Sequence, residues 1–371
     1  MIFNNVTTIS SNAPVNIQLK NGAMTVADGN NPTDALQINF DNDLVFEGLI
    51  NWHDHLDFNL FPQLGNKVYN NYTEWGNYIH THYKDEIAAV LKVPLLLRIN
   101  WGLYKNLLGG VTTVVNHGEQ LAITDAPIKV VQCHSIHSVQ FEKWWKFKLN
   151  NPLKIKQPAV IHVGEGIDES SKKEIDQLTN RNFLKRKLIG IHGVAMNTAQ
   201  AESFEALVWC PESNYFLLNK TAAVTELKKH THILFGTDST LTGSWDIWDH
   251  IRLARKTGQL TDAELYDVLQ SSGPLAINNK GNMVVAKRND EVTSFDSFYA
   301  TKPETILLVV SNSEIRLFDE SLIGQLQQLD LNKFSKIYIE GTCKYVQGNL
   351  PGLIRQIKAY YPEANFPVTI S

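Results

Sequence analysis

One unit repeats through the middle of the chain: a short, apolar, β-branched run ends abruptly in polar residues and is followed by a stretch long enough for a helix. This rhythm indicates parallel βα units, because strands that are buried on both faces are apolar throughout. The pattern predicts strands at 45–52, 111–116, 128–133, 158–163, 187–192, 206–210 and 232–236, with helices at 95–108, 169–180, 218–230 and 261–271.

The predicted strands number seven, one fewer than a (β/α)8 barrel contains. Between residues 135 and 157 there is room for one helix, Phe141–Leu149, but hardly for another βα pair. We therefore expect an α/β fold in which residues 47–281 form a (β/α)8-type, TIM-like barrel that is one unit short or has one irregular strand.

The two ends of the chain contain short β-rich pieces instead. From Val6 to Phe46 they indicate a small antiparallel sheet, and similar pieces return at 283–286, 306–310 and 314–318. We expect residues 1–46 and 282–371 to pair into one sheet domain. The stretch 332–361 is interpreted as a surface α/β appendage without chemistry.

Charge and composition restrict which classes of partner the chain is expected to bind. The formal net charge is −4, and the basic stretch Lys185–Lys187 lacks interleaved aromatic residues, so we interpret it as a solvated helix end and expect no nucleic-acid partner. The cysteines Cys133, Cys210 and Cys343 are widely spaced, which favours neither a disulfide framework nor a CxxC metal site and fits a reducing compartment.

Neither a signal segment nor a membrane span is apparent. The N-terminus has no apolar core, and the apolar run Val93–Leu97 is far shorter than the ~20 residues that cross a bilayer. We expect a cytoplasmic protein that acts on a small molecule and has no membrane partner. A homodimer is compatible with this sequence.

Two histidines stand at the end of the first predicted strand of the barrel. His53 and His55 are two residues apart, so their side chains point to the same face of an extended strand and could bind one metal ion together. An HxH pair alone is weak evidence, because neighbouring surface histidines are common. The position strengthens it, since barrels of this kind build their sites at the carboxyl ends of the strands.

A third histidine, His162, ends the strand at 158–163, and Glu165 follows three residues later. Gly164 and Gly166 allow the chain to turn after His162 and to bring Glu165 back over the mouth of the barrel. The alternative is that Glu165 is a solvated loop acid near the start of the next helix.

His192 and Asp238 also stand at strand ends, in Gly190-Ile191-His192-Gly193 and Gly236-Thr237-Asp238-Ser239. Each alone is equally compatible with a buried histidine or a helix cap. Together with the other histidines they are hard to assign to packing, because unpaired buried polar groups are costly. We assign His117 and His134 to structure or to the rim of the pocket.

With these motifs the chain resembles the amidohydrolase superfamily, and within it the mononuclear branch of nucleobase deaminases and chlorohydrolases. The resemblance implies that His53, His55, His162 and Asp238 are metal ligands, that Glu165 carries a proton, and that His192 orients or polarises the substrate. It also implies a small, discontinuous β-sandwich. The matching motifs are Gly48–Asn51 before His53–His55, Gly109–Val114, His162–Glu165, Ile191–Gly193, Cys210–Asn214 and Gly236–Ser239.

In the binuclear branch of the superfamily that the chain resembles, a carboxylated lysine bridges the two metal ions. No lysine stands at a strand end here, so the resemblance implies one divalent ion. Zinc is the first choice, but histidine and carboxylate ligands also suit iron, nickel and manganese. We expect an amidohydrolase-type hydrolase of C–N bonds in which Asp238 orients or deprotonates the attacking water. The substrate is expected to be an aminated heterocycle that loses its amino group.

Two alternatives are a cyclic amide or ester hydrolase and a non-catalytic protein of the same fold. The insert after the first barrel strand is rich in aromatic residues that could stack a planar ring or merely pack together, and Trp75 is the candidate substrate-binding residue among them. Trp209 and Asn214 are further substrate-binding candidates. The aromatic residues of the insert are Phe58, Phe61, Tyr69, Tyr72, Trp75 and Tyr78.

Overall fold

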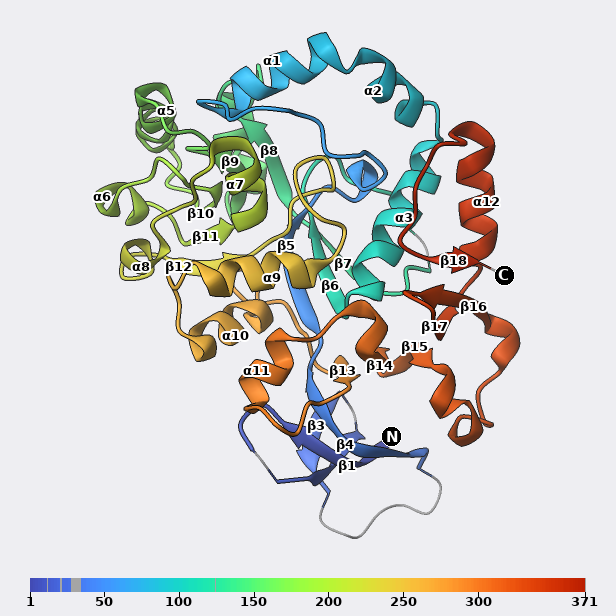
Figure 1. Cartoon of the computed structure of the whole chain (residues 1–371). Helices are drawn as coiled ribbons and strands as arrows, with labels where there is room; N and C mark the ends of the chain where they lie inside the picture. Colours follow the sequence, from blue (N-terminus) through green and yellow to red (C-terminus); the bar gives the residue numbers. More distant parts are fainter. Residues whose placement is uncertain (12, 21, 28–34, 124, 371) are drawn as a thin grey trace.

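The computed structural model describes residues 1–11, 13–20, 22–27, 35–123 and 125–370. It is an α/β structure in which parallel strands and their helices adjoin a mixed sheet built from both ends of the chain (Figure 1). The parallel strands form two sheets. The first contains β5 (Leu49–Asp54), β6 (Val111–Asn116) and β7 (Lys129–Gln132); the second contains β8 (His134–Ser138), β9 (Ala159–Val163), β10 (Leu188–His192), β11 (Ala206–Trp209) and β12 (His232–Phe235).

All seven predicted strand regions of the middle of the chain are present, although the first begins later. It starts at Leu49 because Gly48 separates β5 from the preceding strand. Gly48 packs so closely against Thr112 that a Cβ at this position would lie 2.2 Å from Thr112 Oγ1. The third region is longer than predicted and is divided at Cys133. Its first half, β7, pairs with β6, and its second half, β8, pairs with β9, so one stretch of chain serves both sheets.

The two parallel sheets also meet at β5 and β12. The backbone N–H groups of Thr237 and Asp238, just beyond β12, donate to the carbonyl of His53 on β5 at 3.2 and 3.0 Å. Because a Cβ at Gly236 would lie 2.7 Å from His53 Cβ, only glycine allows this close approach. The strand ends that carry the predicted ligands are thereby held side by side.

Helices cover the parallel strands and the strand ends. Figure 1 shows α1 and α2 above the carboxyl ends of the strands and α12 beside α3. The predicted helices at 95–108 and 169–180 are confirmed as α3 and α5, and the helix at 261–271 is confirmed as α10. The helices are α1 (Tyr72–His82), α2 (Lys84–Leu91), α3 (Leu95–Leu108), α4 (Trp145–Leu149), α5 (Glu169–Asn180), α6 (Thr198–Ala201), α7 (Pro211–Leu218), α8 (Val224–Leu227), α9 (Ile247–Lys256), α10 (Asp262–Gln270), α11 (Ser294–Tyr299) and α12 (Leu350–Tyr360).

The two ends of the chain pair as expected, since β13 runs antiparallel to β4. Hydrogen bonds join all the described strands of these ends into one sheet of ten strands, and they do not delineate the two layers of a sandwich. Its strands are β1 (Ile2–Thr8), β2 (Val15–Lys20), β3 (Ala23–Val26), β4 (Gln37–Glu47), β13 (Met283–Ala286), β14 (Ile306–Ser311), β15 (Glu314–Asp319), β16 (Phe334–Ile339), β17 (Thr342–Gln347) and β18 (Thr369–Ile370).

Three expectations about local structure are wrong. Within the predicted helix at 218–230 only the short α8 forms after Leu218, because Asn219 adopts a left-handed conformation with φ of 48° and ends α7. The helix predicted at Phe141–Leu149 is shortened to α4, and the N-terminal sheet is mixed, since β1 and β4 run parallel.

The basic stretch Lys185–Lys187 is not a solvated helix end. It immediately precedes β10, and Arg186 in its centre is buried. The Arg186 guanidinium donates to the carbonyls of Lys148 and Leu149 at 3.0 Å and to that of Gln157 at 2.7 Å. An arginine can be buried here because its several N–H donors find backbone acceptors.

Among the described helices, none alone is both long and apolar enough to cross a membrane. Helices α2 and α3 together reach that length and composition, but they are bent by 94° at the break between them.

Candidate active site

The predicted ligands converge at the carboxyl ends of four parallel strands. His53 and His55 come from the end of β5, His162 from β9, and His192 from the end of β10, while Asp238 follows β12. Parallel strands bring their carboxyl ends to the same edge, which explains how residues far apart in the sequence meet here.

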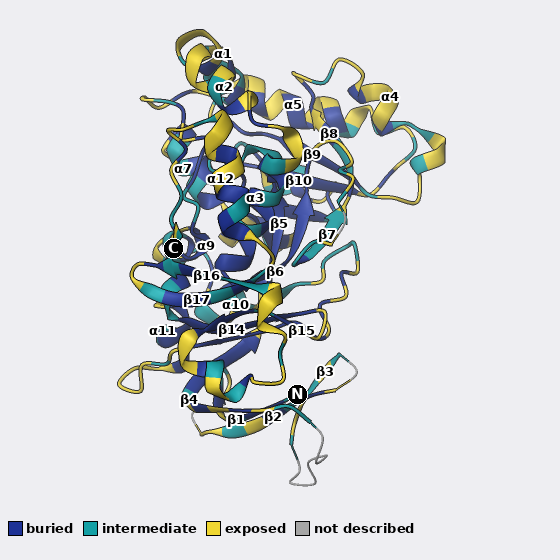
Figure 2. Cartoon of the chain, turned by 90° about the vertical axis from the view of Figure 1, so that its right-hand side faces the viewer, coloured by how far each residue is buried: buried dark blue, intermediate teal, exposed yellow. Residues whose placement is uncertain are grey.

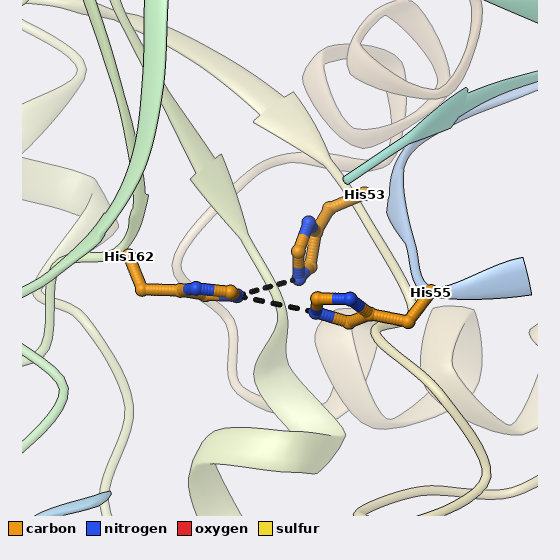
Figure 3. A group of neighbouring side chains, drawn as sticks. All are labelled: His53, His55 and His162. Atoms are coloured by element: carbon orange, nitrogen blue, oxygen red, sulfur yellow. Dashed lines mark hydrogen bonds between the residues drawn. The ribbon is translucent and has the colours of Figure 1, made fainter. Parts of the chain in front are cut away.

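Three imidazole nitrogens approach one another closely. His162 Nε2 lies 3.2 Å from His53 Nε2 and 3.4 Å from His55 Nε2 (Figure 3). The Nδ1 of His162 lies 2.8 Å from the carbonyl of His137, an acceptor, so Nδ1 carries the proton and Nε2 presents a lone pair. This tautomer is the one that binds a metal ion.

The carboxylate of Asp238 completes the group. Its Oδ1 lies 3.5 Å from His53 Nε2 and 3.7 Å from His55 Nε2, and its Oδ2 accepts hydrogen bonds from Ser213 and Thr242. Burial acts to raise the pKa of Asp238, but the hydrogen bond with His53 and the electrostatic effect of the surrounding imidazoles outweigh burial and hold the pKa well below its usual range. Asp238 is therefore an anion at neutral pH.

Burial keeps two histidines of this group, His55 and His162, neutral. Burial and the neighbouring charge of His53 lower the pKa of His55 to about 3, and burial lowers the pKa of His162 well below its usual value. Neutral imidazoles and one carboxylate form a nitrogen-rich donor set of the kind that holds Zn²⁺ or a similar divalent cation. Because one ligand atom each of His53, His55 and His162 lies within 4.8 Å of the other two, and the same holds for His53, His192 and Asp238, the residues present fit a bound metal ion.

Glu165 stands beside this group and is buried. Gly164 turns the chain with φ of 63°, and Glu165 is only 5% exposed, which does not fit a solvated loop acid. Its Oε2 lies 3.5 Å from His192 Nε2. Burial, and then the negative charges of Asp238 and Glu174, raise the pKa of Glu165 well above its usual value, which favours the protonated form of the carboxyl.

A chain of buried hydrogen bonds lies behind His192. Trp209 Nε1 donates to Thr221 Oγ1 at 2.6 Å, Thr221 donates to Asn214 Oδ1 at 3.2 Å, and Asn214 Nδ2 donates to His192 Nδ1 at 2.9 Å. This direction leaves the His192 proton on Nε2, which faces Glu165. His192 adopts a left-handed conformation with φ of 72°, a strained state that is typical of functional sites.

A second buried carboxyl lies behind Glu165. The hydroxyl of Tyr72 donates to Glu174 Oε2 at 3.2 Å, and the backbone N–H of Tyr72 donates to the carbonyl of Glu165 at 3.0 Å. Burial raises the pKa of Glu174 to about 7. Helix α1 is thus attached through its backbone to the loop that carries Glu165, and through the Tyr72 side chain to α5.

A polar cluster that the sequence pattern does not predict lies beneath the first two histidines. Asp54 stands between them and is fully buried, and Lys105 Nζ on α3 lies 3.2 Å from Asp54 Oδ2. Asn106 and Asn59 donate to the two oxygens of Asp54 at 2.8 and 2.6 Å. Lys105 is engaged in this ion pair and also reaches Thr237 Oγ1 at 3.4 Å.

A cavity of about 440 Å³ opens over Glu165, His192 and Asp238. Its walls are largely apolar, and the described residues that line it include neither lysine nor arginine. The predicted Trp75 lies in this lining, whereas Trp209 and Asn214 lie outside it, behind His192. The lining consists of His55, Phe58, Trp75, Gly76, Asn77, Ile79, His80, His137, Phe141, His162, Glu165, His192, Asp238, Ser239, Leu241 and Thr242.

Other histidines surround the site. The ring of His117 lies 4.4 Å from that of His162, and both of its nitrogens are buried without a hydrogen-bond partner among the described residues. His134 accepts from Arg186 at 2.9 Å, away from the cavity lining. His137, which the sequence pattern did not single out, lines the cavity, and its carbonyl orients His162. Its place on the strand next to β9 was the available signal.

Comparison with known proteins gives information on the fold. No family model and no curated protein sequence matches this chain. Among solved structures, an adenosine deaminase from Xanthomonas campestris with bound zinc is similar with a TM-score of 0.64, at 14% identity over 98% of each chain.

Two other solved structures cover 85% of this chain. Guanine deaminase from C. acetobutylicum, with guanine in its active site, matches over 99% of its own length at 13% identity with a TM-score of 0.62. Atrazine chlorohydrolase TrzN from Arthrobacter aurescens TC1, complexed with zinc, matches over 94% of its own length at 14% identity with a TM-score of 0.62. The chain therefore has the fold of the amidohydrolase-superfamily deaminases and chlorohydrolases that its motifs resemble.

Proposed function

We propose that this chain is a metal-dependent hydrolase of C–N bonds that releases ammonia from a small aminated heterocycle. The proposal rests on the convergence of three imidazole nitrogens and one anionic carboxylate beside the buried carboxyl of Glu165, at the base of a mostly apolar cavity. His53, His55, His162 and Asp238 would hold one divalent ion, with zinc as the first choice and iron, nickel or manganese as alternatives. When bound, such an ion activates water and polarises the substrate.

The protein residues supply the proton transfers. Asp238 is anionic and accepts hydrogen bonds from Ser213 and Thr242, so it can accept a proton from the attacking water or orient that water. The raised pKa of Glu165 favours its protonated form, which can deliver a proton to the leaving nitrogen. His192 presents its Nε2–H to the same region and would stabilise negative charge that develops on the substrate.

The walls of the cavity define the substrate further. Trp75, Phe58 and Phe141 offer faces for a planar ring, and Asn77, Ser239 and Thr242 offer hydrogen bonds. Without a lysine or arginine in the described lining, a carboxylate or phosphate on the substrate would lose its hydration without gaining a partner. We infer that the substrate is uncharged apart from its reacting group.

The same residues could also open a cyclic amide or ester. An ammonia-release assay with zinc-loaded protein, run on aminated purines, pyrimidines and triazines beside cyclic amides and esters, distinguishes these functions. Release of ammonia from at least one neutral ring supports the proposal. Turnover of only the cyclic amides or esters would replace deamination by amide or ester hydrolysis, and inertness of a metal-loaded, folded protein across the whole panel would favour a non-catalytic role.

We further propose that β5 to β12 form a distorted (β/α)8-type barrel. The contact between β5 and β12, and the division of one stretch of chain between β7 and β8, support this interpretation. The corresponding domain division assigns residues 47–281 to the barrel and the two ends of the chain to the second domain. A cytoplasmic location and a homodimer remain predictions.

A further inference from the structure

We infer that the surface around α4 binds anionic lipid bilayers peripherally. This basic apolar surface consists of the exposed side chains of residues 141–156, a segment with five lysines and one glutamate in a chain whose formal net charge is −4. It lies beside α5 and β8, at the end of the molecule away from β1 and β2 (Figure 2). The inference is independent of the proposed function.

Large apolar side chains are exposed here at high density. Leu153 is 90% exposed, Phe147 is 72% exposed and Trp144 is 57% exposed, while Phe141 and Ile155 are also exposed. Trp144 and Phe147 lie together, with ring centroids 5.5 Å apart. Contiguous apolar groups of this kind on a protein surface are typical of contact with another molecule or a membrane.

The surface is fixed by the fold. Trp145 and Leu149 are buried and anchor α4 from below. The buried Arg186 binds the carbonyls of Lys148, Leu149 and Gln157, which ties both ends of the following loop to the start of β10. The exposed apolar side chains are therefore displayed on a well-anchored segment.

Lysines are interleaved with these apolar side chains. Lys143, Lys146 and Lys156 are exposed and form no ion pair with any described residue, whereas Lys148 pairs with Glu142 at 2.6 Å. Lys143 Nζ lies 5.7 Å from the centroid of the Trp144 ring. Side chains of this kind place their methylenes on apolar surface and their ammonium groups at the level of anionic headgroups.

A bilayer fits this pattern better than two other partners. A second copy of the chain docked on the same face would bring the unpaired lysines of both copies together. A nucleic acid would use Trp144 and Phe147 for stacking, but it would leave the most exposed side chain, Leu153, without a partner. Trp, Phe and Leu side chains beside lysines are the composition of a segment that lies in the membrane interface.

The surface adjoins the substrate cavity. Phe141 belongs to both, because it is exposed on this surface and also lines the cavity. Docking through α4 would therefore place the mouth of the cavity near the bilayer. Peripheral binding through α4 would contradict the expectation of no membrane partner, which rests on the lack of an apolar run long enough to span a bilayer.

The test is flotation of the full chain with vesicles of phosphatidylcholine alone or with about 30% phosphatidylserine. We expect at least ~10-fold more binding to the anionic vesicles and its loss in high salt. The variants Trp144→Ser/Phe147→Ser/Leu153→Ser and Lys143→Glu/Lys156→Glu should each lose it. The matched controls Leu95→Ser/Leu96→Ser and Lys20→Glu/Lys280→Glu, which change exposed residues elsewhere, should bind like wild type.

A second measurement reports insertion directly. Brominated lipids should quench wild-type tryptophan fluorescence, and Trp144→Phe should remove most of that quenching. Equal binding by all variants, or quenching that Trp144→Phe does not change, would overturn the inference. Failure to bind anionic vesicles would also overturn it. In that case, binding of single-stranded RNA would identify a nucleic-acid surface, and self-association that the Trp144 variant abolishes would identify an interface between copies of the chain.

Discussion

Lys105 and Asp54 form a buried ion pair directly beneath the two histidines of β5, with 3.2 Å between Lys105 Nζ and Asp54 Oδ2. Asp54 is the residue between His53 and His55, so whatever holds its carboxylate also fixes the backbone that aims both imidazoles. The polar cluster thus links α3 to the candidate metal ligands.

Lys105→Met should leave the Asp54 carboxylate buried without its cation. Breaking a buried pair in this way costs about 3–5 kcal/mol of unfolding free energy, and loss of such supporting groups weakens metal affinity about 10–100-fold. Urea unfolding and metal titration measure the two effects. The double variant Lys105→Met/Asp54→Asn removes both charges and should regain part of the stability; if Lys105→Met alone is as stable as wild type, the pair has no such role.

Asn214→Ala should release His192 from its fixed orientation. The Asn214 amide donates to His192 Nδ1 at 2.9 Å and lies outside the cavity lining, so we expect kcat to fall on the order of 10–100-fold while KM changes less. Thr221→Val is the control, because it removes the hydrogen bond to Asn214 without touching His192. A change in KM with unchanged kcat would instead favour direct substrate binding by Asn214.

Glu174 should make stability depend on pH. Burial raises its pKa from 4.5 to about 7, so between these values the folded chain retains a proton that the unfolded chain has lost. The free energy of unfolding should therefore decrease as pH rises through this window. Above the window it should be lower by the full cost of ionising the buried Glu174 carboxyl. Glu174→Gln keeps an acceptor for Tyr72 but does not titrate.

Urea unfolding of wild type and Glu174→Gln, measured from pH 4 to pH 8 at the same metal content, tests this. The stability of the variant relative to wild type should increase with pH. Parallel pH profiles for the two proteins would show that Glu174 has the same pKa in the folded and unfolded chains.

Glu165→Gln should separate metal binding from turnover. Glu165 lies beside the ligand group, and a general acid or base contributes roughly 10²–10⁴-fold, so turnover should fall by at least ~100-fold while metal content is unchanged. The contrasting variant is His162→Ala, which should lose the ion itself. Near-normal turnover by Glu165→Gln on a confirmed substrate would show that Glu165 does not transfer the proton.

The parallel strands and the convergence of His53, His55, His162 and Asp238 could be predicted from the sequence, because apolar runs locate the strands and the polar residues that end them share one edge. The ion pair of Lys105 could not be predicted, because Lys105 lies on a helix and reaches Asp54 only through the packing of α3. That packing brings Gly102 so close to Leu56 that a Cβ at Gly102 would lie 2.2 Å from the Leu56 carbonyl oxygen.

The sequence also could not determine which sides of β11 and α7 face the cavity. Trp209 and Asn214 follow the motif pattern of pocket residues, yet their side chains are fully buried behind His192. Their neighbours in space, Thr221 and His192, come from other parts of the chain. The prediction of a helix at 218–230 was wrong for a local reason. The apolar periodicity of the sequence continues past Asn219, but the left-handed backbone of Asn219 ends α7.

Metal stoichiometry tests the central claim most directly. Elemental analysis of wild-type protein reconstituted with Zn²⁺, Fe²⁺ or Mn²⁺ and then freed of unbound metal should find about one ion per chain, and the His53→Ala/His55→Ala double variant, checked for its fold by circular dichroism, should retain none. Two tightly held ions per chain, or equal metal content in wild type and the folded double variant, would contradict the account.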